Sequence, residues 1–241
     1  GQFDDAIARY SKALAIAPDD SEAHYNMGVA LQKMERLEEA ASSYQNALAN
    51  NPDNFAAHNN LGAVFQDLGK LDEAVASYHQ ALTKKPDFAQ AIYNLGITFQ
   101  KLGYFNDAVV SYRKALAIDP DYDEAHNNLG NALRDLGEIN EAMACFQKAI
   151  AINPDYAEAH NNLGTVFQEL GQQEEAIEAY RRALRIRPDY EIASVCLLHQ
   201  LRHACAWREV EELELSVKKF TETSIREGSK VALRPFDNMT T

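Results

Sequence analysis

The sequence predicts an all-α protein built as a solenoid of stacked helix-turn-helix repeats. Three observations predict it: proline recurs at a fixed interval, small and aromatic residues recur in step with it, and apolar residues in between have helical spacing. Six of the seven prolines stand 34 residues apart, namely Pro18, Pro52, Pro86, Pro120, Pro154 and Pro188. One unit of this length cannot bury its apolar face alone, whereas a stack of units can.

The repeats share four further columns, one of glycine, two of alanine and one of aromatic residues. The glycines are Gly28, Gly62, Gly96, Gly130 and Gly164. The alanines are Ala6, Ala40, Ala74, Ala108, Ala142 and Ala176, and then Ala13, Ala47, Ala81, Ala115, Ala149 and Ala183. The aromatic column is Tyr10, Tyr44, Tyr78, Tyr112, Phe146 and Tyr180. We expect the small residues to let helix backbones approach closely and the rings to fill the space between neighbouring repeats.

Each repeat is predicted to hold two helices. In the fourth complete repeat, the first helix is expected over residues 124–136 and the second over residues 139–152. Gly137 lies between them, where a tight turn needs glycine, and Pro154 ends the second helix. The complete repeats are residues 21–54, 55–88, 89–122, 123–156 and 157–190.

Both ends depart from the pattern. Residues 1–20 form a second helix without its first, so the chain is expected to begin within a repeat and to expose a flank of Ile7, Tyr10 and Leu14. We expect self-association through this end. Residues 191–228 are a degenerate repeat with capping helices, in which an apolar side of Val210, Leu213, Val217, Phe220 and Ile225 covers the last repeat and Gly228 is the C-cap. Residues 229–241 are expected to be a linker.

Composition limits the classes of function. The chain has 241 residues, 46% of them hydrophobic, and no apolar run reaches the about 18 residues that suggest a membrane span. Its net charge of −13 repels phosphate, so we expect neither a nucleic acid nor a membrane as partner. The opening residues show no signal peptide, and Cys145, Cys196 and Cys205 form no CxxC pair. These features favour a cytoplasmic protein.

The columns resemble those of the tetratricopeptide repeat, which combines Leu-Gly, an alanine, an aromatic residue four positions later, a further alanine and a proline. The resemblance covers about 190 residues. It implies a right-handed superhelix whose first helices line the concave surface. One departure is histidine where the family often has tryptophan, at His24, His58, His126 and His160. With at most one per repeat they cannot easily share a metal ion, so we expect them to pack on helix faces.

An asparagine stands at the sixth position of every complete repeat: Asn26, Asn60, Asn94, Asn128 and Asn162. Positions 2, 6, 9 and 13 form one stripe of the first helix, which the resemblance places on the concave surface. Position 12 lies on its shoulder, with Gln32, Gln66, Gln100, Arg134 and Gln168. Amides donate to and accept from an extended backbone, so these ten residues are the predicted peptide-binding site. The alternative is a role in solubility and in hydrogen bonding between adjacent first helices.

Two kinds of array compete. Adaptors that clamp acidic chaperone tails carry lysine at position 5, where this chain has Tyr25, Asn59, Tyr93, Asn127 and Asn161, so the cationic clamp is missing. The asparagine column resembles the repeat region of O-GlcNAc transferase and its bacterial relatives, as do His203, Cys205 and Trp207 and the later Pro235-Phe236. This implies an arm that guides extended protein substrates to a UDP-sugar-dependent domain beginning after Thr241. The alternative is a free-standing scaffold with no enzyme attached.

The sequence shows no motif that performs chemistry by itself, such as a glycine-rich phosphate loop, HExxH or GxSxG. We therefore expect no catalytic residue, no cofactor and no metal site. The paired carboxylates Asp4/Asp5, Glu38/Glu39 and Glu174/Glu175 flank helix starts, where they favour the helix dipole. His199 and His203 have a metal-compatible spacing, but without a third ligand we expect them to be packed.

Overall fold

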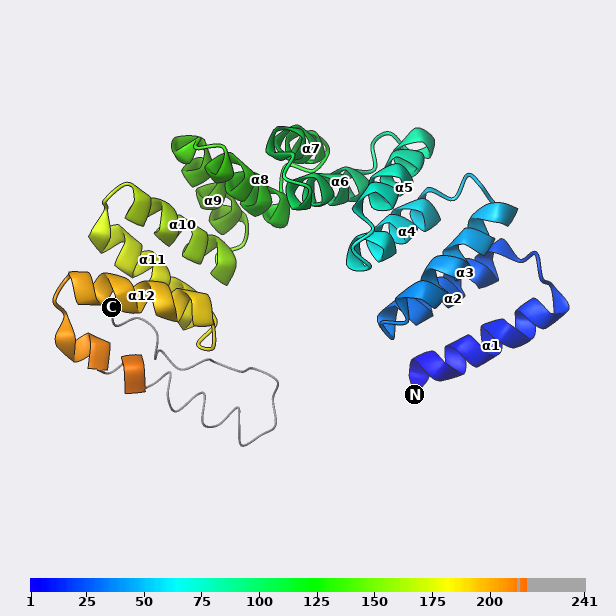
Figure 1. Ribbon diagram of the computed structural model, residues 1–241, viewed down its shortest axis with the longest axis horizontal. Coiled ribbons are helices and arrows are strands. Elements are labelled where there is room, and N and C mark those ends of the chain that lie inside the picture. The colour runs from blue at the N-terminus through cyan, green and yellow to red at the C-terminus, as the bar shows by residue number, and fades with distance from the viewer. Residues whose placement is uncertain (212, 216–241) are drawn as a thin grey trace. The chain divides into compact units, whose positions relative to one another are not determined.

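The computed structural model describes residues 1–211 and 213–215, and every regular element in that part is an α-helix (Figure 1). The prediction of an all-α solenoid is confirmed. Twelve helices have both ends within the described residues: α1 (Gln2–Ile16), α2 (Ser21–Lys33), α3 (Leu37–Asn50), α4 (Phe55–Asp67), α5 (Leu71–Lys84), α6 (Ala89–Lys101), α7 (Phe105–Ile118), α8 (Asp123–Asp135), α9 (Ile139–Ile152), α10 (Ala157–Glu169), α11 (Gln173–Ile186) and α12 (Glu191–His203). Residues 207–211 and 213–215 are also helical.

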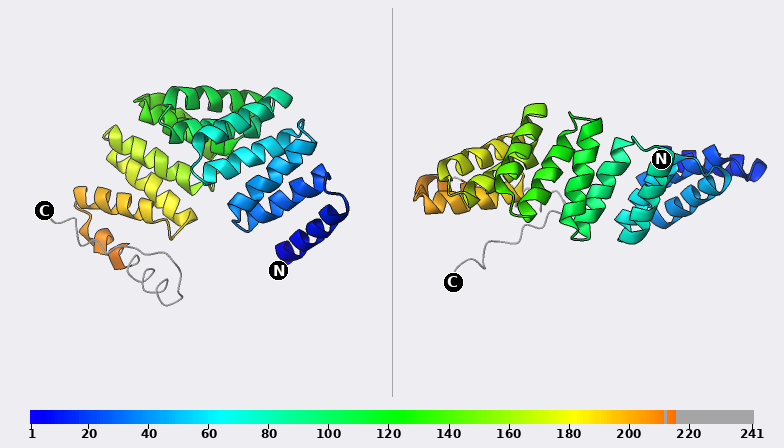
Figure 2. Two further views of the ribbon diagram at one scale, coloured as in Figure 1. Left: turned by 45° about the vertical axis from the view of Figure 1, so that its right-hand side comes forward. Right: turned by 90° about the horizontal axis from the view of Figure 1, so that it is seen from above.

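The described residues divide into two compact units, one of residues 1–136 and one that begins at Gly137. Within the first unit, α2 packs on α3, α4 on α5 and α6 on α7, and each second helix also packs on the next first helix (Figure 2). The first helices α2, α4, α6 and α8 contact one another in sequence. In the second unit α10 packs on α11, and α12 contacts both of them. Successive first helices are therefore neighbours within each unit, and this neighbourhood positions the asparagine column.

The turns between the two helices of a repeat use a left-handed residue. Gly69, Gly103, Gly137 and Gly171 have φ between 72° and 82°, as expected for a position that favours glycine. At the same place in the repeat, Glu35 has φ 58° and Cys205 has φ 55°. The period is therefore kept even where glycine is replaced, and these two non-glycine residues carry backbone strain.

The aromatic column forms the centre of each repeat's core. The rings of Tyr44, Tyr78, Tyr112, Phe146 and Tyr180 are 0% exposed. A Cβ atom built on Gly28 would lie 2.8 Å from the ring of Tyr44, and Gly62, Gly96 and Gly164 face their own tyrosines in the same way. Each of these glycines therefore makes room for the ring of its own repeat, rather than only for a helix backbone. Tyr44 also clusters with Leu61 and Val64 of the next repeat, so the expected packing between neighbours is confirmed there.

The predicted helix boundaries hold to within one residue. The first helix of the fourth complete repeat is Asp123–Asp135, one residue earlier than expected, and the second is Ile139–Ile152, as expected. The paired carboxylates lie in the first turns of α1, α3 and α11, also as expected.

The two ends differ in how fully they are covered. Val210 is 5% exposed in a cluster with α12, and Leu213 packs against that cluster, so this part of the expected cap covers the last repeat. The expected cap residues Val217, Phe220, Ile225 and Gly228, and the linker at 229–241, lie outside the described residues. On α1, Ile7 packs against the core of the first complete repeat. Tyr10 and Leu14 are half-buried rather than exposed, and self-association through this helix stays a prediction.

Candidate functional site

The asparagine column lies on the first helices at the border between core and solvent. Asn26, Asn60, Asn94 and Asn128 belong to α2, α4, α6 and α8 of the first unit, and Asn162 belongs to α10 of the second unit. All five side chains are half-buried. This intermediate exposure leaves each amide accessible while neighbouring residues hold it in place.

Three of these asparagines donate a hydrogen bond backwards to the preceding first helix. Asn60 Nδ2 lies 3.3 Å from Tyr25 Oη, Asn94 Nδ2 lies 3.1 Å from Asn59 Oδ1, and Asn128 Nδ2 lies 2.9 Å from Tyr93 Oη. The acceptor always stands at position 5 of the preceding repeat. The role in hydrogen bonding between adjacent first helices, which the sequence left open, is therefore a property of the fold.

The amide oxygens of the same asparagines accept hydrogen bonds from their own helices. Asn59 Nδ2 donates to Asn60 Oδ1 at 3.2 Å, and Asn127 Nδ2 donates to Asn128 Oδ1 at 3.3 Å. Asn94 Oδ1 accepts from Gln90 Nε2 at 3.1 Å, and Gln90 Oε1 accepts from Tyr122 Oη at 3.1 Å.

These contacts join into one continuous series of hydrogen bonds, which we call the amide chain. It runs in a single donor-to-acceptor direction through Tyr122, Gln90, Asn94, Asn59, Asn60 and Tyr25. Because Asn59 is buried, its paired amide avoids the cost of a buried polar group without a partner. The amide chain therefore ties three successive repeats together along one face and fixes the orientation of its amides.

Asn94 and Asn128 nevertheless keep hydrogen-bonding capacity for a ligand, whereas Asn60 Nδ2 contacts the hydroxyls of both Tyr25 and Tyr44. A primary amide has two N–H donors and two oxygen lone pairs. The contacts of Asn94 use one donor and one lone pair, and the contacts of Asn128 do the same. One donor and one acceptor remain at each of these half-exposed side chains. A fixed amide with one free donor and one free acceptor matches the needs of a peptide backbone.

The position-12 glutamines are bound to the aromatic column. Tyr44, Tyr112 and Tyr180 donate their hydroxyl hydrogens to Gln32, Gln100 and Gln168 at 2.9, 3.0 and 3.1 Å. These amide oxygens therefore hold the repeat's own core residue, a role that position and residue type alone did not indicate. The amide nitrogen of Gln100 in turn donates to Asp135 Oδ2 at 3.4 Å.

The second complete repeat breaks this pairing. Gln66 Oε1 accepts from Thr98 Oγ1 of the next repeat at 2.8 Å. The hydroxyl of Tyr78 is left buried without a hydrogen-bond partner. In the fourth repeat both members of the pair differ, since Phe146 has no hydroxyl and Arg134 replaces glutamine. Arg134 is half-buried. The sequence thus keeps glutamine at position 12 only where a tyrosine stands in the aromatic column.

Burial keeps these phenols protonated. Burial raises the pKa of the Tyr44 and Tyr112 hydroxyls well above the usual range of tyrosine, and it raises the pKa of Tyr122 to about 12. A protonated phenol can donate to an amide oxygen, as each of these three residues does.

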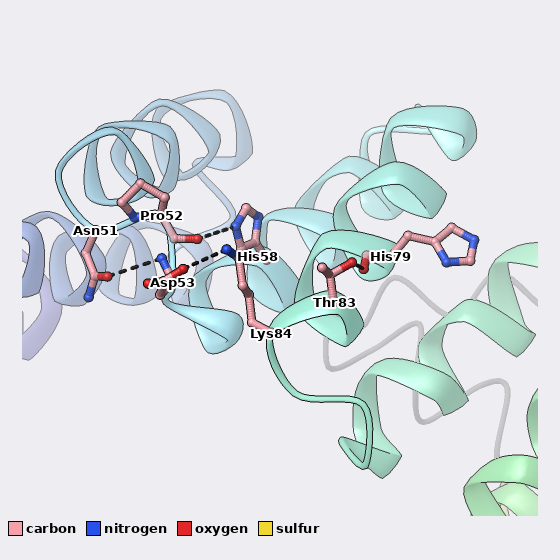
Figure 3. Close-up of polar contacts among 7 residues, drawn as sticks. All are labelled: Asn51, Pro52, Asp53, His58, His79, Thr83 and Lys84. Atoms are coloured by element: carbon pink, nitrogen blue, oxygen red, sulfur yellow. Dashed lines mark hydrogen bonds and ion pairs between the residues drawn. The ribbon is translucent and has the colours of Figure 1, made fainter.

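Four of the repeat histidines are bound to the preceding proline turn. The Nε2 atoms of His24, His58, His126 and His160 lie 2.9, 3.1, 2.9 and 3.0 Å from the carbonyl oxygens of Pro18, Pro52, Pro120 and Pro154. Figure 3 shows His58 with Pro52, and the adjacent ion pair in which Lys84 Nζ lies 2.6 Å from Asp53. These histidines are half-buried, and their hydrogen bonds connect the proline turn to the first helix. The sequence predicted that they pack on helix faces, and the structure shows them half-buried there, with a carbonyl partner that the sequence did not predict.

His199 and His203 differ from the expectation. Both side chains are exposed on α12, so the prediction that they are packed is wrong. Within residues 1–211 and 213–215, no three His, Cys, Asp or Glu side chains come together in a way that could hold a metal ion. In the same ranges, no helix combines the length and apolar character needed to cross a bilayer.

Known structures share this fold. YrrB, described as a TPR protein with an unusual peptide-binding site, is 25% identical, with a TM-score of 0.62 over 76% of this chain and 95% of YrrB. PilF of Pseudomonas aeruginosa is 17% identical, with a TM-score of 0.74 over 85% of this chain and 93% of PilF. MamA is 23% identical, with a TM-score of 0.62 over 67% of this chain and 95% of MamA. The likeness to PilF and MamA concerns the fold alone.

Family profiles agree with the fold. A profile described as TPR repeat matches residues 1–35, 101–133 and 130–171, and profiles described as tetratricopeptide repeat match residues 25–89 and 157–190. No curated protein sequence matches the chain. Because the profile matches together span most of the sequence and agree with its period and its helix pairs, the chain belongs to the tetratricopeptide-repeat family.

Proposed function

We propose that the chain binds polypeptide segments in extended conformation through its asparagine column. The observation that carries this proposal is the state of Asn94 and Asn128, whose amides are half-exposed, fixed by inter-repeat hydrogen bonds and still have one donor and one acceptor each. Asn26, Asn60 and Asn162 occupy the same register in their repeats. Each repeat would offer one amide to the backbone of the ligand.

The amide chain lowers the cost of binding. An amide that is already oriented loses little side-chain freedom when a ligand arrives, so more of the hydrogen-bond energy appears as affinity. Each hydrogen bond contributes roughly 0.5–1.5 kcal/mol net, so one at each repeat contributes a few kcal/mol in total. Ordering a flexible peptide offsets part of that gain. The expected binding is weak and reads backbone more than side-chain sequence.

The charge of the surface favours neutral or basic ligands. The chain carries a formal net charge of −13, and position 5 of the complete repeats holds tyrosine or asparagine rather than lysine. No cationic clamp for carboxylates is present at that position, and an acidic peptide would meet a repulsive field.

We infer further that the array serves as the substrate-recognition arm of an O-GlcNAc transferase-like glycosyltransferase. The resemblance of the asparagine column and of the segment with His203, Cys205 and Trp207 supports this. A free-standing scaffold is the second candidate, and the likeness to YrrB over 95% of that chain favours it. The reading frame after Thr241 separates the two. A nucleotide-sugar domain there supports the enzyme arm, and a stop within a few codons supports the scaffold.

The binding proposal is tested with a panel of unstructured fluorescent peptides of basic, neutral and acidic composition. A triple variant with Asn94→Ala, Asn128→Ala and Asn162→Ala is expected to weaken binding of the basic and neutral peptides. The matched control carries Asn46→Ala, Asn106→Ala and Asn140→Ala on second helices, where all three side chains are exposed. If both triple variants keep their helical content and bind the peptides with equal affinity in anisotropy titrations, the proposal is wrong.

A further inference from the structure

Two exposed histidines form a close pair on helix α12. His199 and His203 lie one turn apart on α12, with their Nε2 atoms 3.2 Å apart and their ring centroids 4.5 Å apart. Residues such as Leu197, Leu198 and Leu201 bury the opposite side of α12 in the core. The two imidazoles therefore present adjacent nitrogens to solvent from a rigid helix.

The separation of the two nitrogens is that of two ligands on one metal ion. Two imidazole nitrogens bound at about 2.05 Å to a tetrahedral zinc ion lie about 3.3 Å apart. The observed 3.2 Å is within a few tenths of an ångström of this value, so the two nitrogens already have the spacing of two ligands on one ion. Imidazole also suits Ni²⁺ and Cu²⁺ among the late first-row cations.

The pair differs from the other histidines of the chain in having both Nε2 atoms directed at each other. His24, His58, His126 and His160 spend Nε2 on proline carbonyl groups. His79 is exposed on α5 and belongs to the other compact unit. Of the seven histidines, only His199 and His203 therefore offer two nitrogens to one point.

The surroundings of the pair favour a cation. His203 is the last residue of α12, where the carbonyl end of the helix dipole attracts positive charge. The adjacent Arg202 forms an ion pair with Glu214 at 2.6 Å, which offsets its repulsion of a bound ion. Gln200 Nε2 lies 3.4 Å from His199 Nδ1 and can donate only while that nitrogen carries no hydrogen. When an ion holds Nε2 and the hydrogen is on Nδ1, the Gln200 amide has to turn so that its oxygen accepts from Nδ1.

We propose that His199 and His203 form a two-imidazole binding site for a late first-row divalent cation such as Zn²⁺ or Ni²⁺. The ion replaces the hydrogen shared between the two Nε2 atoms, and that hydrogen moves to Nδ1 of the same ring, so both Nε2 lone pairs face the ion. The remaining coordination positions are filled by water or by a donor group of a ligand. In the repeat register, the pair occupies positions 9 and 13, the same positions as Thr165 and Glu169 on α10.

The test is calorimetric titration of the chain with Ni²⁺ and with Zn²⁺ at neutral pH, in the reduced state. One ion per chain is expected to bind at this site. His199→Ala and His203→Ala should each weaken its association by roughly tenfold or more, because either change leaves only one imidazole of the chelating pair. His79→Ala is the matched control and should leave the affinity unchanged.

A second readout uses Co²⁺, which broadens the NMR signals of nuclei close to it. The ring protons of His199 and His203 should broaden first, while those of His126 stay sharp. Cys205→Ser is included because an exposed thiol stands two residues after His203. The proposal is overturned if no ion binds, if the single histidine variants bind as tightly as the unaltered chain, or if Cys205→Ser removes binding that His199→Ala retains.

Discussion

The buried hydroxyl of Tyr78 gives the sharpest test of how the repeats are held together. Tyr78 and Tyr112 occupy the same place in successive repeats, and both rings are 0% exposed. Tyr112 donates to Gln100 at 3.0 Å, whereas the Tyr78 hydroxyl has no partner and Gln66 of its repeat accepts from Thr98. The same substitution, tyrosine to phenylalanine, should therefore have opposite effects at the two positions.

The magnitudes follow from these contacts. Tyr112→Phe removes one hydrogen bond, and because Gln100 is half-buried, water can rehydrate its oxygen, so the loss is about 1 kcal/mol. Tyr78→Phe removes a buried hydroxyl that was never paired, which relieves about 1–3 kcal/mol of desolvation cost less a small packing loss. The two variants should differ by roughly 2 kcal/mol, with Tyr78→Phe at least as stable as the unaltered chain.

The assay is urea unfolding followed by circular dichroism, with midpoints compared between variants because a repeat array need not unfold in one step. Adding Thr98→Val frees Gln66 to accept from Tyr78, so Tyr78→Phe should become destabilising in that background. Equal midpoints for Tyr78→Phe and Tyr112→Phe would refute the reasoning, as would an unchanged effect of Tyr78→Phe in the presence of Thr98→Val.

Three further predictions concern strain, an unpaired acceptor and pH. Glu35→Gly should stabilise the chain by about 1 kcal/mol in urea unfolding, because Glu35 adopts φ 58°; a lower midpoint would contradict this. Cys196→Asn should raise the thermal midpoint, since Asn161 Oδ1 is buried without a partner and Cys196 takes the register position from which asparagine donates in earlier repeats; no rise would argue against a pairing role for this position. Burial lowers the pKa of His160 below its ordinary 6.5, so its stabilising contribution is present above that value and is lost as pH falls through the lower folded-state pKa. His160→Gln should reduce this acid sensitivity, and identical pH profiles would refute it.

The fold was predictable because its information is periodic. The proline interval located every repeat, and helix ends in the fourth complete repeat fell within one residue of their predicted places. The left-handed turns at Glu35 and Cys205 were not predicted, because neither residue is a glycine. The period alone would have found them, because Glu35 stands 34 residues before Gly69 and Cys205 stands 34 after Gly171. A repeat register is therefore a better guide to backbone conformation here than local propensity.

The site was predictable in position but not in its partners. The sequence identified the asparagine column, because the same residue recurs at one position of every complete repeat. It did not predict that Asn94 would donate to Asn59, or that Tyr112 would donate to Gln100. Those bonds depend on the distance between stacked helices and on side-chain rotamers, which a one-dimensional pattern does not contain. In the fourth complete repeat, Phe146 has no hydroxyl and Arg134 replaces glutamine. This joint change is the sequence signal from which the pairing of tyrosine with glutamine could have been predicted.

The central claim is that fixed, half-exposed amides of the asparagine column hold an extended peptide. It is tested most directly by following the side-chain NH₂ resonances of Asn94 and Asn128 in nitrogen-15 NMR spectra during titration with a basic unstructured peptide. The account predicts that these resonances shift saturably with the fraction of chain bound, while those of Asn46 and Asn106 do not move. Saturable binding with unmoved Asn94 and Asn128 resonances would contradict it and would place the ligand on another surface.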